Sequence, residues 1–299
     1  MYTSSFFLPT MREAPKDAVI ASHVLMIRAG LVGKLSSGIY GFLPLGLRAL
    51  RKVERIVREE MDAIGANEFL IPVLIPGELW KQSGRWSAMG PELFRLQGRN
   101  EADYVLAPTH EEAFTWLLKD HIRSYRDLPL SVYHIGPKFR DEIRPRFGVM
   151  RGKTFIMKDA YSFHSPDDPG SLDRTYSLMA EAYRRIFSRC GLHTVPVSAH
   201  SGTMGGSVSE EFMVPAEVGE EQIVRCPSCG YAANREKAEC RGEQIDYTDR
   251  GPLAEVHTPG VKTIEELSRF LDTDPRMLIK TLIFRTGDGR YVLALIRGD

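Results

Sequence analysis

Two long strand-like segments, at 130–142 and 154–163, constrain the fold of this chain more than any other feature of its sequence. A loop rather than a helix joins them, so they are expected to pair as an antiparallel hairpin. Further strand-like segments, at 104–107 and on both sides of the glycine-rich stretch 201–207, occur without regular alternation of strand and helix. This order predicts an α+β domain in which helices pack against an antiparallel sheet.

Two amphipathic helices are expected to cover that sheet. Apolar residues recur every three or four positions in 44–64, where Pro44 marks the start and Gly65 lies just past the end. The same spacing recurs over 172–190 and stops at Gly191. Each segment therefore predicts a helix with one apolar face.

An apolar run at 69–75 follows the first helix and contains Pro72. Proline cannot donate a hydrogen bond to a neighbouring strand, so this strand is expected at the edge of a sheet. An edge strand needs a partner or a cover. The segment therefore predicts a contact between two copies of the chain, that is, a homodimer.

The composition limits the class of protein. The 299 residues are 43% hydrophobic and 26% charged, which suffices for one large domain or two ordinary ones. The longest apolar runs, such as 70–76, are far shorter than the roughly 18 residues that a membrane span needs. Residues 1–17 have no basic start, sustained apolar core or small-residue cleavage site, so a cytoplasmic protein with no membrane partner is expected. The formal net charge is zero, so a nucleic acid must be bound by a local basic patch.

The loop of the predicted hairpin supplies such a patch. A solvated loop is the simpler interpretation, but Arg140 and Glu142 are two residues apart and are expected to share one face of a strand. The loop is also longer than the two to five residues that a hairpin needs. An arginine held on a strand offers a planar fork for a phosphate, and a carboxylate beside it accepts from an amino group. The basic residues are Lys138, Arg140, Arg144, Arg146, Arg151 and Lys153, against Asp141 and Glu142.

The sequence PTHEE at 108–112 opens another predicted helix. Thr109 and Glu112 have the spacing of a capping box, which would give both residues a purely structural role. Glu111 is not needed for that cap and is free for other chemistry.

Three of the four cysteines lie close together, as Cys226, Cys229 and Cys240. A CxxC pair followed by a third cysteine indicates zinc, although a structural site uses four ligands, and Cys190 and His257 are weak candidates for the fourth. The alternative is a vestigial ribbon with free thiols. The composition changes at about Gln222, which predicts one domain over 1–222 and a second over 223–299.

Several of these motifs resemble known enzymes. FRDE followed by a basic loop resembles the second signature motif of class II aminoacyl-tRNA synthetases, and 44–75 resembles the first. The resemblance to bacterial-type prolyl-tRNA synthetases covers essentially the whole chain. It rests on SGRW at 83–86, PTHEE at 108–112, the segment 139–164 and GGS at 205–207.

The resemblance implies that ATP and proline form prolyl-adenylate, after which the prolyl group passes to tRNA(Pro). The carboxylate of proline is already ionised at neutral pH, so the first step needs alignment and charge neutralisation rather than a general base. By the resemblance Arg140 contacts the α-phosphate and Glu142 the adenine amino group, and both are expected to be catalytic. Phe147 would stack on the base and Arg151 would reach the phosphates, with Mg²⁺ on the pyrophosphate oxygens.

The resemblance also implies a proline pocket. It places Thr109 and Glu111 at the imino group, whose two N–H donors a hydroxyl and a carboxylate can accept. Met157, Asp159 and Phe163 share one face of the second strand and would form its floor. The alternative is ordinary core for Met157 and Phe163 and an ion-paired acid for Asp159. His200 and Glu210 depart from the family pattern, so neither is given a role.

Residues 223–299 resemble the start of an inserted domain that in many relatives hydrolyses mischarged alanyl-tRNA(Pro). Such editing is needed because missing methylenes give only about 1–3 kcal/mol of discrimination. Lys280 matches the editing lysine, and a solvent-facing lysine on a strand is the alternative. A third class II motif and an anticodon-binding domain are not found, so the chain is expected to be the N-terminal part of a longer protein. Two other interpretations are a threonyl or seryl class II enzyme and a non-catalytic relative that binds tRNA.

Overall fold

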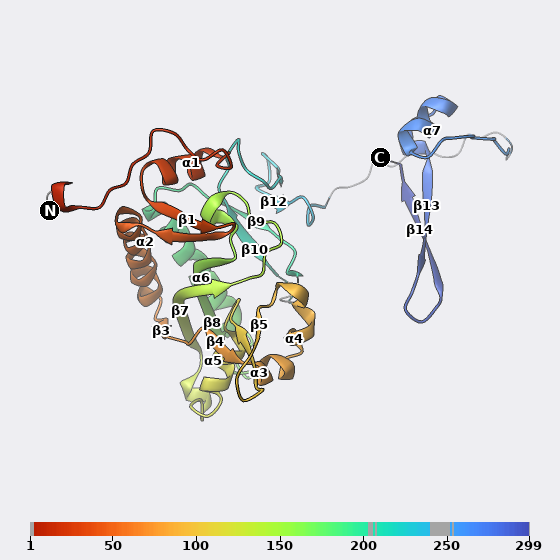
Figure 1. The fold of residues 1–299 in the computed structure, drawn as a ribbon. Helices are drawn as coiled ribbons and strands as arrows, with labels where there is room; N and C mark the ends of the chain where they lie inside the picture. The colour runs from red at the N-terminus through yellow and green to blue at the C-terminus, as the bar shows by residue number, and fades with distance from the viewer. Residues whose placement is uncertain (1–2, 203–205, 207, 240–251, 253, 299) are drawn as a thin grey trace. The chain divides into compact units, whose positions relative to one another are not determined.

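A computed structural model of the chain describes residues 3–202, 206, 208–239, 252 and 254–298. The chain forms two compact units, Met1–Ala238 and Glu239–Asp299 (Figure 1). In the described residues no helix is both long and apolar enough to cross a membrane.

A long antiparallel hairpin forms the centre of the first unit. β7 (Leu130–Phe139) and β8 (Thr154–Phe163) pair along their whole length, from Leu130 opposite Phe163 to Phe139 opposite Thr154. The short strand β3 (Asn67–Glu68) pairs in parallel with β7. The predicted bounds of the second long strand are confirmed.

The predicted first strand was too long at its C-terminal end. β7 ends at Phe139, because beyond it the chain turns and the N–H of Glu142 donates to the carbonyl of Arg140 at 2.8 Å. Arg140 and Glu142 therefore follow the strand instead of sharing one of its faces. The loop then crosses the N-terminal hairpin, where a Cβ on Gly152 would lie 2.7 Å from the carbonyl oxygen of Gly38.

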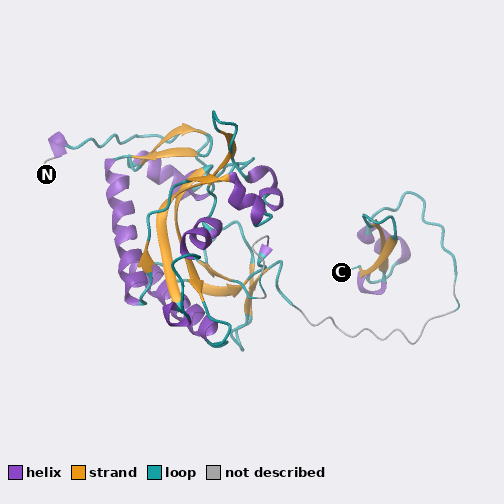
Figure 2. Ribbon diagram, turned by 90° about the horizontal axis from the view of Figure 1, so that it is seen from below, coloured by secondary structure: helices purple, strands orange, loops and turns teal. Residues whose placement is uncertain are grey.

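Both predicted amphipathic helices are confirmed, and they lie alongside the central strands (Figure 2). α2 spans Pro44–Ala63 and α6 spans Ser171–Arg189. Buried Met61 and Tyr133 join the two helices to the sheet in one apolar cluster, against which Met179 packs. Arg189 of α6 also donates to Glu60 of α2 at 2.8 Å.

A second small sheet lies beside the first. Its strand order is β4-β6-β5, and short helices α3 to α5 pack around a core that includes the fully buried Trp80 and Phe114. The elements are β4 (Leu74–Pro76), α3 (Gly77–Gln82), α4 (Arg85–Ala88), η2 (Gly90–Glu92), β5 (Arg95–Gln97), β6 (Asp103–Leu106), α5 (Glu111–Leu118) and η3 (Tyr125–Asp127).

The apolar run at 69–75 was predicted as one strand, and this prediction is wrong. The run links β3 of the central sheet to β4 of the small sheet, and Pro72 lies between them outside any strand. The chain changes partners within it: the N–H of Phe69 donates to Tyr133 in β7, whereas the carbonyl of Val73 accepts from Ala107.

The remaining elements of the first unit frame the hairpin. An N-terminal hairpin contacts the loop between β7 and β8, and the strands after α6 form a four-stranded sheet of order β10-β9-β12-β11. These elements are η1 (Thr3–Ser5), α1 (Ala21–Arg28), β1 (Val32–Ser36), β2 (Ile39–Phe42), η4 (Gly148–Met150), β9 (Val195–Ser198), β10 (Glu210–Met213), β11 (Ile223–Arg225) and β12 (Ala232–Asn234).

The first compact unit extends beyond the domain boundary expected after Gln222. β12 pairs in parallel with β9 through Ala233 and Ser198, so β11 and β12 belong to the first unit. The division between the units comes after Ala238.

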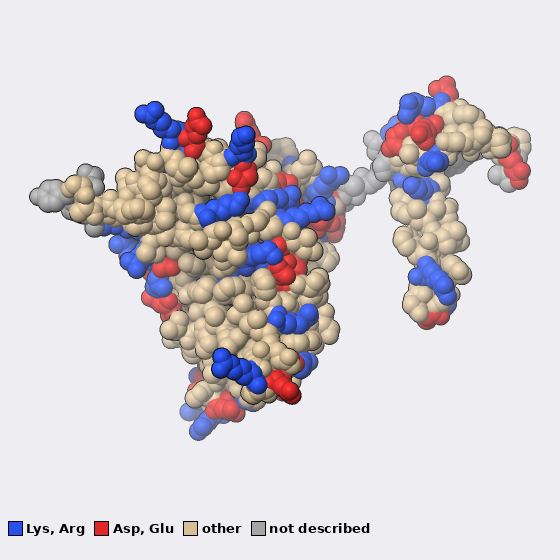
Figure 3. Space-filling model, viewed as in Figure 1, with Lys and Arg blue, Asp and Glu red and all other residues tan. Residues whose placement is uncertain are grey.

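The second unit contains a helix and a hairpin. α7 (Ile264–Leu271) begins at a capping box formed by Thr263 and Glu266. After η6 (Pro275–Met277), the strands β13 (Ile279–Arg285) and β14 (Tyr291–Arg297) pair antiparallel. Many apolar side chains of this hairpin are exposed, and few charged ones lie between its base and its turn (Figure 3).

Candidate functional site

The end of β7 brings two of the predicted motifs together. The N–H of Phe139 donates to the carbonyl of Ala107 at 3.1 Å, two residues before Thr109. The N–H of Asp141 donates to the carbonyl of Glu92 at 2.8 Å. These backbone bonds hold the FRDE segment against the turn that carries PTHEE.

A cavity of about 310 Å³ opens at the end of the hairpin. It brings together three of the residues predicted to bind ATP, namely Arg140, Glu142 and Arg151. Its other lining residues are Glu92, Met150, Gly152 and Phe155.

Glu142 is held as a carboxylate in this cavity. Arg151 Nε donates to it at 2.8 Å, and the N–H of Arg144 donates at 3.0 Å. The hydrogen bond from Arg151 and then that from Arg144 lower the pKa of Glu142. Each carboxylate oxygen keeps a lone pair that can accept from an amino group.

Arg140 has a donor that the protein itself does not use. Its Nε is buried and has no hydrogen-bond partner in the described part of the chain. Its guanidinium carbon lies 5.3 Å from the ring centre of Phe155, which helps to hold the side chain in place. A buried donor without an acceptor is costly, so Arg140 is arranged to receive an anionic ligand.

Phe147 does not join this cavity. It adopts a left-handed conformation with φ of 59° and lines a separate hollow of about 370 Å³ with His23 and Tyr40. Phe155 is the aromatic residue beside Arg140. The sequence contained a signal for it, because Phe155 lies two residues before Met157 and so shares its strand face.

The predicted capping box at the start of α5 is wrong. His110 occupies the N-cap position, and no side chain caps the helix there. Thr109 Oγ1 instead accepts from Arg85 Nη2 at 3.0 Å, and Glu112 accepts from Ser83 at 2.8 Å and from Arg85. Glu111 accepts from Arg85 Nη1 at 2.8 Å. Arg85 belongs to the SGRW motif, and its contacts with this turn were not predicted.

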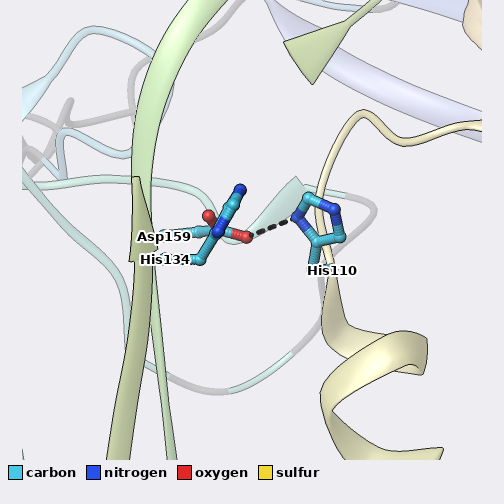
Figure 4. Close-up of side chains that lie close together, drawn as sticks. All are labelled: His110, His134 and Asp159. Carbon is cyan, nitrogen blue, oxygen red and sulfur yellow. Dashed lines mark hydrogen bonds and ion pairs between the residues drawn. The ribbon is translucent and has the colours of Figure 1, made fainter. Parts of the chain in front are cut away.

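Asp159 lies in a buried polar cluster behind the PTHEE turn (Figure 4). The ammonium of Lys138 is 2.9 Å away, His110 Nδ1 is 3.3 Å away, and the hydroxyl of Tyr161 donates at 2.6 Å. Burial alone would raise the pKa of Asp159, but these three partners outweigh it and lower the pKa. Because Tyr161 also accepts from the N–H of His110 at 2.8 Å, the cluster fixes the turn that carries Thr109 and Glu111.

Ligand atoms of His110, His134 and Asp159 lie within 4.8 Å of one another. That spacing would suit a metal ion, but the ammonium of Lys138 already supplies the cation that pairs with Asp159. Burial lowers the pKa of Lys138, whereas the contact with Asp159 opposes that effect. The cluster is therefore best described as a buried ion pair with hydrogen-bonding neighbours.

The other predicted floor residues differ in their surroundings. Phe163 packs against the core cluster that contains Trp80 and Phe114, which matches its interpretation as core. Met157 is half-buried and lies opposite Gly136 in the register. Met157 is thus partly accessible, while Asp159 and Phe163 contact neighbouring protein groups.

The two described cysteines of the cluster lie on the turn between β11 and β12. The N–H of Cys226 donates to the carbonyl of Tyr231 at 2.8 Å, and its sulfur is 3.1 Å from the hydroxyl of Ser228. The hydrogen bond with Ser228 and those from the backbone lower the pKa of Cys226 to about 6. Cys229 is exposed, and Cys240 lies outside the described residues.

Three further residues from the sequence analysis can be placed. Lys280 is exposed on β13, opposite Ile296. Glu210 accepts from the hydroxyl of Tyr176 at 3.0 Å, and His200 Nδ1 accepts from the N–H of Gly202 at 3.1 Å. The contacts of Glu210 and His200 are local and structural.

Family profiles match both compact units. Residues 94–247 match the tRNA synthetase class II core domain (G, H, P, S and T), and residues 258–299 match the aminoacyl-tRNA editing domain. The matched part of the first unit includes the PTHEE turn, the hairpin and the cavity at its end.

Curated relatives are similar over the whole chain. The chain is 55% identical over 300 residues to a proline–tRNA ligase of Caldicellulosiruptor saccharolyticus, covering 100% of this chain and 52% of that protein. It is 56% identical over 299 residues to one of Thermoanaerobacter pseudethanolicus, with the same coverage. The chain thus spans about half the length of the curated relatives that it matches.

Solved structures share the fold of the first unit. The Giardia lamblia prolyl-tRNA synthetase in complex with prolyl-adenylate aligns with a TM-score of 0.53 at 24% identity, covering 58% of this chain and 36% of that one. A structure described as the RNA binding domain of threonyl-tRNA synthetase from Cryptosporidium parvum aligns with a TM-score of 0.51 at 23% identity, covering 56% and 41%. With the profile match over more than half of its residues, the chain belongs to the class II tRNA synthetase core family.

Proposed function

We propose that this chain forms the amino-acid-activating part of a proline–tRNA ligase, which joins ATP and proline to prolyl-adenylate and then charges tRNA(Pro). The observation that carries the proposal is the backbone contact of Phe139 with Ala107, which sets Arg140 and Glu142 next to Thr109 and Glu111. The two groups suit the two substrates, because one offers cations to phosphate and the other offers acceptors to an ammonium. The similarity to proline–tRNA ligases over the whole chain supports proline as the amino acid.

ATP is proposed to bind in the cavity at the end of the hairpin. Arg140 would contact the α-phosphate, where negative charge grows as the proline carboxylate attacks phosphorus. Pyrophosphate leaves with the electron pair of the broken P–O bond, so no proton has to move. Glu142 would accept from the adenine amino group, and Phe155, rather than Phe147, would stack on the base. Arg151 would reach the phosphates.

Magnesium is expected on the oxygens of the leaving pyrophosphate. The cavity offers two acids, Glu92 and Glu142, and Glu142 is already paired with Arg151. A magnesium ion typically takes only one or two protein carboxylates when it binds substrate phosphates. The ion would neutralise charge that the arginines do not reach.

Proline is proposed to bind at the PTHEE turn. A secondary ammonium has two N–H donors, which Thr109 and Glu111 would accept. Met157 would contact the ring. Asp159 would not contact proline directly but would position the PTHEE turn through Tyr161 and His110. Phe163 would stabilise the strand by packing against the core.

The remaining assignments concern other parts of the activity. Residues 223–299 are proposed to begin the editing domain, with Lys280 contributing to hydrolysis of mischarged alanyl-tRNA(Pro). A cytoplasmic homodimer that uses the segment at 69–75 is proposed. The support is the exposure of Leu70 and Leu74 and an apolar hollow of about 310 Å³ beside Pro72.

Zinc binding by Cys226, Cys229 and Cys240 is also proposed. The lowered pKa of Cys226 suits the thiolate that zinc needs. Metal analysis of the purified natural protein is expected to give close to one equivalent of zinc, which Cys226→Ser abolishes. Less than about a tenth of an equivalent under conditions that retain zinc would leave a turn with free thiols.

The test of the proposed function is amino-acid-dependent pyrophosphate exchange by the natural full-length protein. Proline is expected to support exchange, with threonine and serine far below it, because the chain is similar to proline–tRNA ligases over its whole length. Exchange with threonine or serine at the rate of proline would favour a class II enzyme of different specificity. No exchange with any amino acid, together with no ATP binding, would favour the non-catalytic tRNA-binding alternative.

A further inference from the structure

Arg85 contacts three of the four polar side chains of the PTHEE turn, namely Thr109, Glu111 and Glu112. It lies at the start of α4, and its Nη2 donates to Thr109 Oγ1 at 3.0 Å. Its Nη1 donates to Glu111 Oε2 at 2.8 Å and to Glu112 Oε2 at 3.0 Å. A single guanidinium therefore bridges both of the acceptors assigned to the ammonium of proline.

We propose that Arg85 is the positioning residue of the ammonium site, which fixes the direction of its acceptors and sets its net charge. This inference rests on the proposed function, because it concerns the same amino acid substrate. Arg85 does not need to touch proline for this role, since it acts through Thr109 and Glu111.

The hydrogen-bonding pattern leaves room for the substrate. The contact with Arg85 uses Oε2 of Glu111 and leaves Oε1 to accept from an incoming N–H. The hydroxyl of Thr109 accepts one bond from Arg85 and keeps a second lone pair for another donor. The fork thus orients two acceptors at once, which matches the two N–H groups of a secondary ammonium.

The charges also match. Glu111 and Glu112 are adjacent carboxylates, and Arg85 supplies one positive charge, so the group has a net charge of −1 when both acids are ionised. That value pairs with one ammonium. Without Arg85 the site would hold two neighbouring negative charges that repel each other, and the side chain of Glu112 is only 4% exposed.

Arg85 is itself held in place. Its guanidinium carbon lies 4.7 Å from the ring centre of Trp80, which is fully buried, and its side chain is 16% exposed. A lysine could supply the charge, but its ammonium cannot bridge Thr109 and the two glutamates with one planar fork.

The test compares Arg85→Lys, Arg85→Gln and Arg95→Lys in the natural full-length protein by proline-dependent pyrophosphate exchange. Both Arg85 variants are expected to raise the KM for proline by about tenfold or more, while the KM for ATP changes by less than about twofold. Arg95→Lys is the matched control, because it makes the same exchange at an arginine of β5 that donates to the backbone carbonyl of Gly90 at 3.0 Å instead of to the PTHEE turn. It should change the KM for proline by less than about threefold.

The outcomes separate this inference from the proposed function. A protein that shows no proline-dependent exchange in its natural form contradicts the proposed function. If the natural protein is active and Glu111→Gln raises the KM for proline, but Arg85→Lys does not, the inference about Arg85 alone is wrong. It is also wrong if Arg95→Lys raises the KM for proline as much as Arg85→Lys does, or if Arg85→Lys raises both KM values equally, since either result describes a merely structural residue.

Discussion

At the end of the hairpin, Arg140 has a buried donor without a hydrogen-bond partner in the part of the chain that the structure describes. This lowers the stability of the fold, and a bound ligand would offset the loss. The buried Nε of Arg140 has no acceptor within the described residues, and leaving such a donor unsatisfied costs about 1–3 kcal/mol. Glu142 and Arg151 are paired with each other, yet both still line the open cavity. The free protein is thus prepared for an anion at Arg140 while its other charges are neutralised.

The first prediction concerns the carboxylate of the PTHEE turn. Glu111→Gln is expected to raise the KM for proline far more than the KM for ATP, because it removes the charge opposite the ammonium and leaves the phosphate contacts unchanged. Steady-state pyrophosphate exchange at varied proline and varied ATP measures both constants.

A control for this prediction lies on a different helix, α3. Glu78→Gln removes an acidic charge from the first turn of α3, away from the turn that carries Thr109. It should leave both constants within about twofold of the natural protein. Equal increases in both constants for Glu111→Gln would mean that PTHEE has only a structural role.

At this scale the sequence predicted residue types better than residue partners. Arg140, Glu142 and Arg151 were expected in one site from the charges of the loop and from the family resemblance, and they do meet in one cavity. Phe147 was expected at the adenine base from the family resemblance, but its backbone is left-handed and it lines a different hollow. Backbone conformation at one residue is not visible in a residue pattern.

At the scale of elements, a buried ion pair stabilises the hairpin and the turn beside it. Lys138 on β7 and Asp159 on β8 lie 2.9 Å apart and are almost completely buried. Such a pair stabilises the fold little more than an apolar pair would. Removing one partner, however, leaves a buried charge without compensation and destabilises the fold. Tyr161 extends the pair to the backbone of His110.

The second prediction is that Asp159→Asn lowers the free energy of unfolding at pH 7 by about 3–5 kcal/mol, because Lys138 is left buried without its partner. The pKa of Asp159 is lowered in the folded state, so its ionised form contributes stability above the unfolded pKa of about 4. That contribution is lost as the pH falls toward the folded pKa. The difference between the natural protein and the variant should therefore shrink below about pH 4.

Urea unfolding of both proteins across pH measures this difference, with Asp167→Asn in an exposed loop as the control. A loss of less than about 1 kcal/mol at pH 7, or a difference that grows as the pH falls, would contradict the role assigned to the pair.

The elements themselves were largely readable from the sequence. Helix periodicity with proline and glycine at the ends gave α2 and α6 to within two residues at either end. The run at 69–75 was misread because apolar residues indicate burial but not the strand that will pair with them. Its two ends pair with different sheets, and that choice depends on residues more than thirty positions away.

At the scale of the whole molecule, the two compact units differ in how well they cover their apolar residues. The first unit has two clusters of buried apolar side chains between helices and sheets, although some of its apolar residues, such as Leu70, are exposed. In the second unit, Ile283 and Leu293 pair across the hairpin and are 66% and 62% exposed, and Phe284 on the opposite face is 54% exposed. Apolar faces of this kind favour association.

The third prediction concerns this exposed face. The 299-residue chain is expected to associate as its concentration rises, and Ile283→Lys should reduce that association by at least about twofold, because it places a charge in the apolar face. Gly287→Lys is the matched control: it adds the same charge at the turn, where a Cβ would meet open space. Static light scattering over a concentration series gives the comparison, and equal effects of the two variants would show that the face is not the cause.

Domain organisation could be predicted only in part. The order of the motifs was sufficient to indicate the class II family, and the profile match confirms it. The change in composition near Gln222 suggested a domain boundary there. The first unit extends beyond that position, because β12 pairs with β9, which lies more than thirty residues earlier in the chain. Long-range backbone pairing of this kind leaves no mark on local composition.

The account depends most on Arg140 as the group that stabilises the α-phosphate during formation of the adenylate. The direct test is the rate of proline-dependent pyrophosphate exchange by Arg140→Ala in the natural full-length protein, compared with Arg144→Ala, which removes an exposed arginine from the same loop. We predict that Arg140→Ala lowers the rate by about 10²-fold or more and that Arg144→Ala changes it by less than about threefold. A near-natural rate for Arg140→Ala, or an equal loss in both variants, would contradict the account.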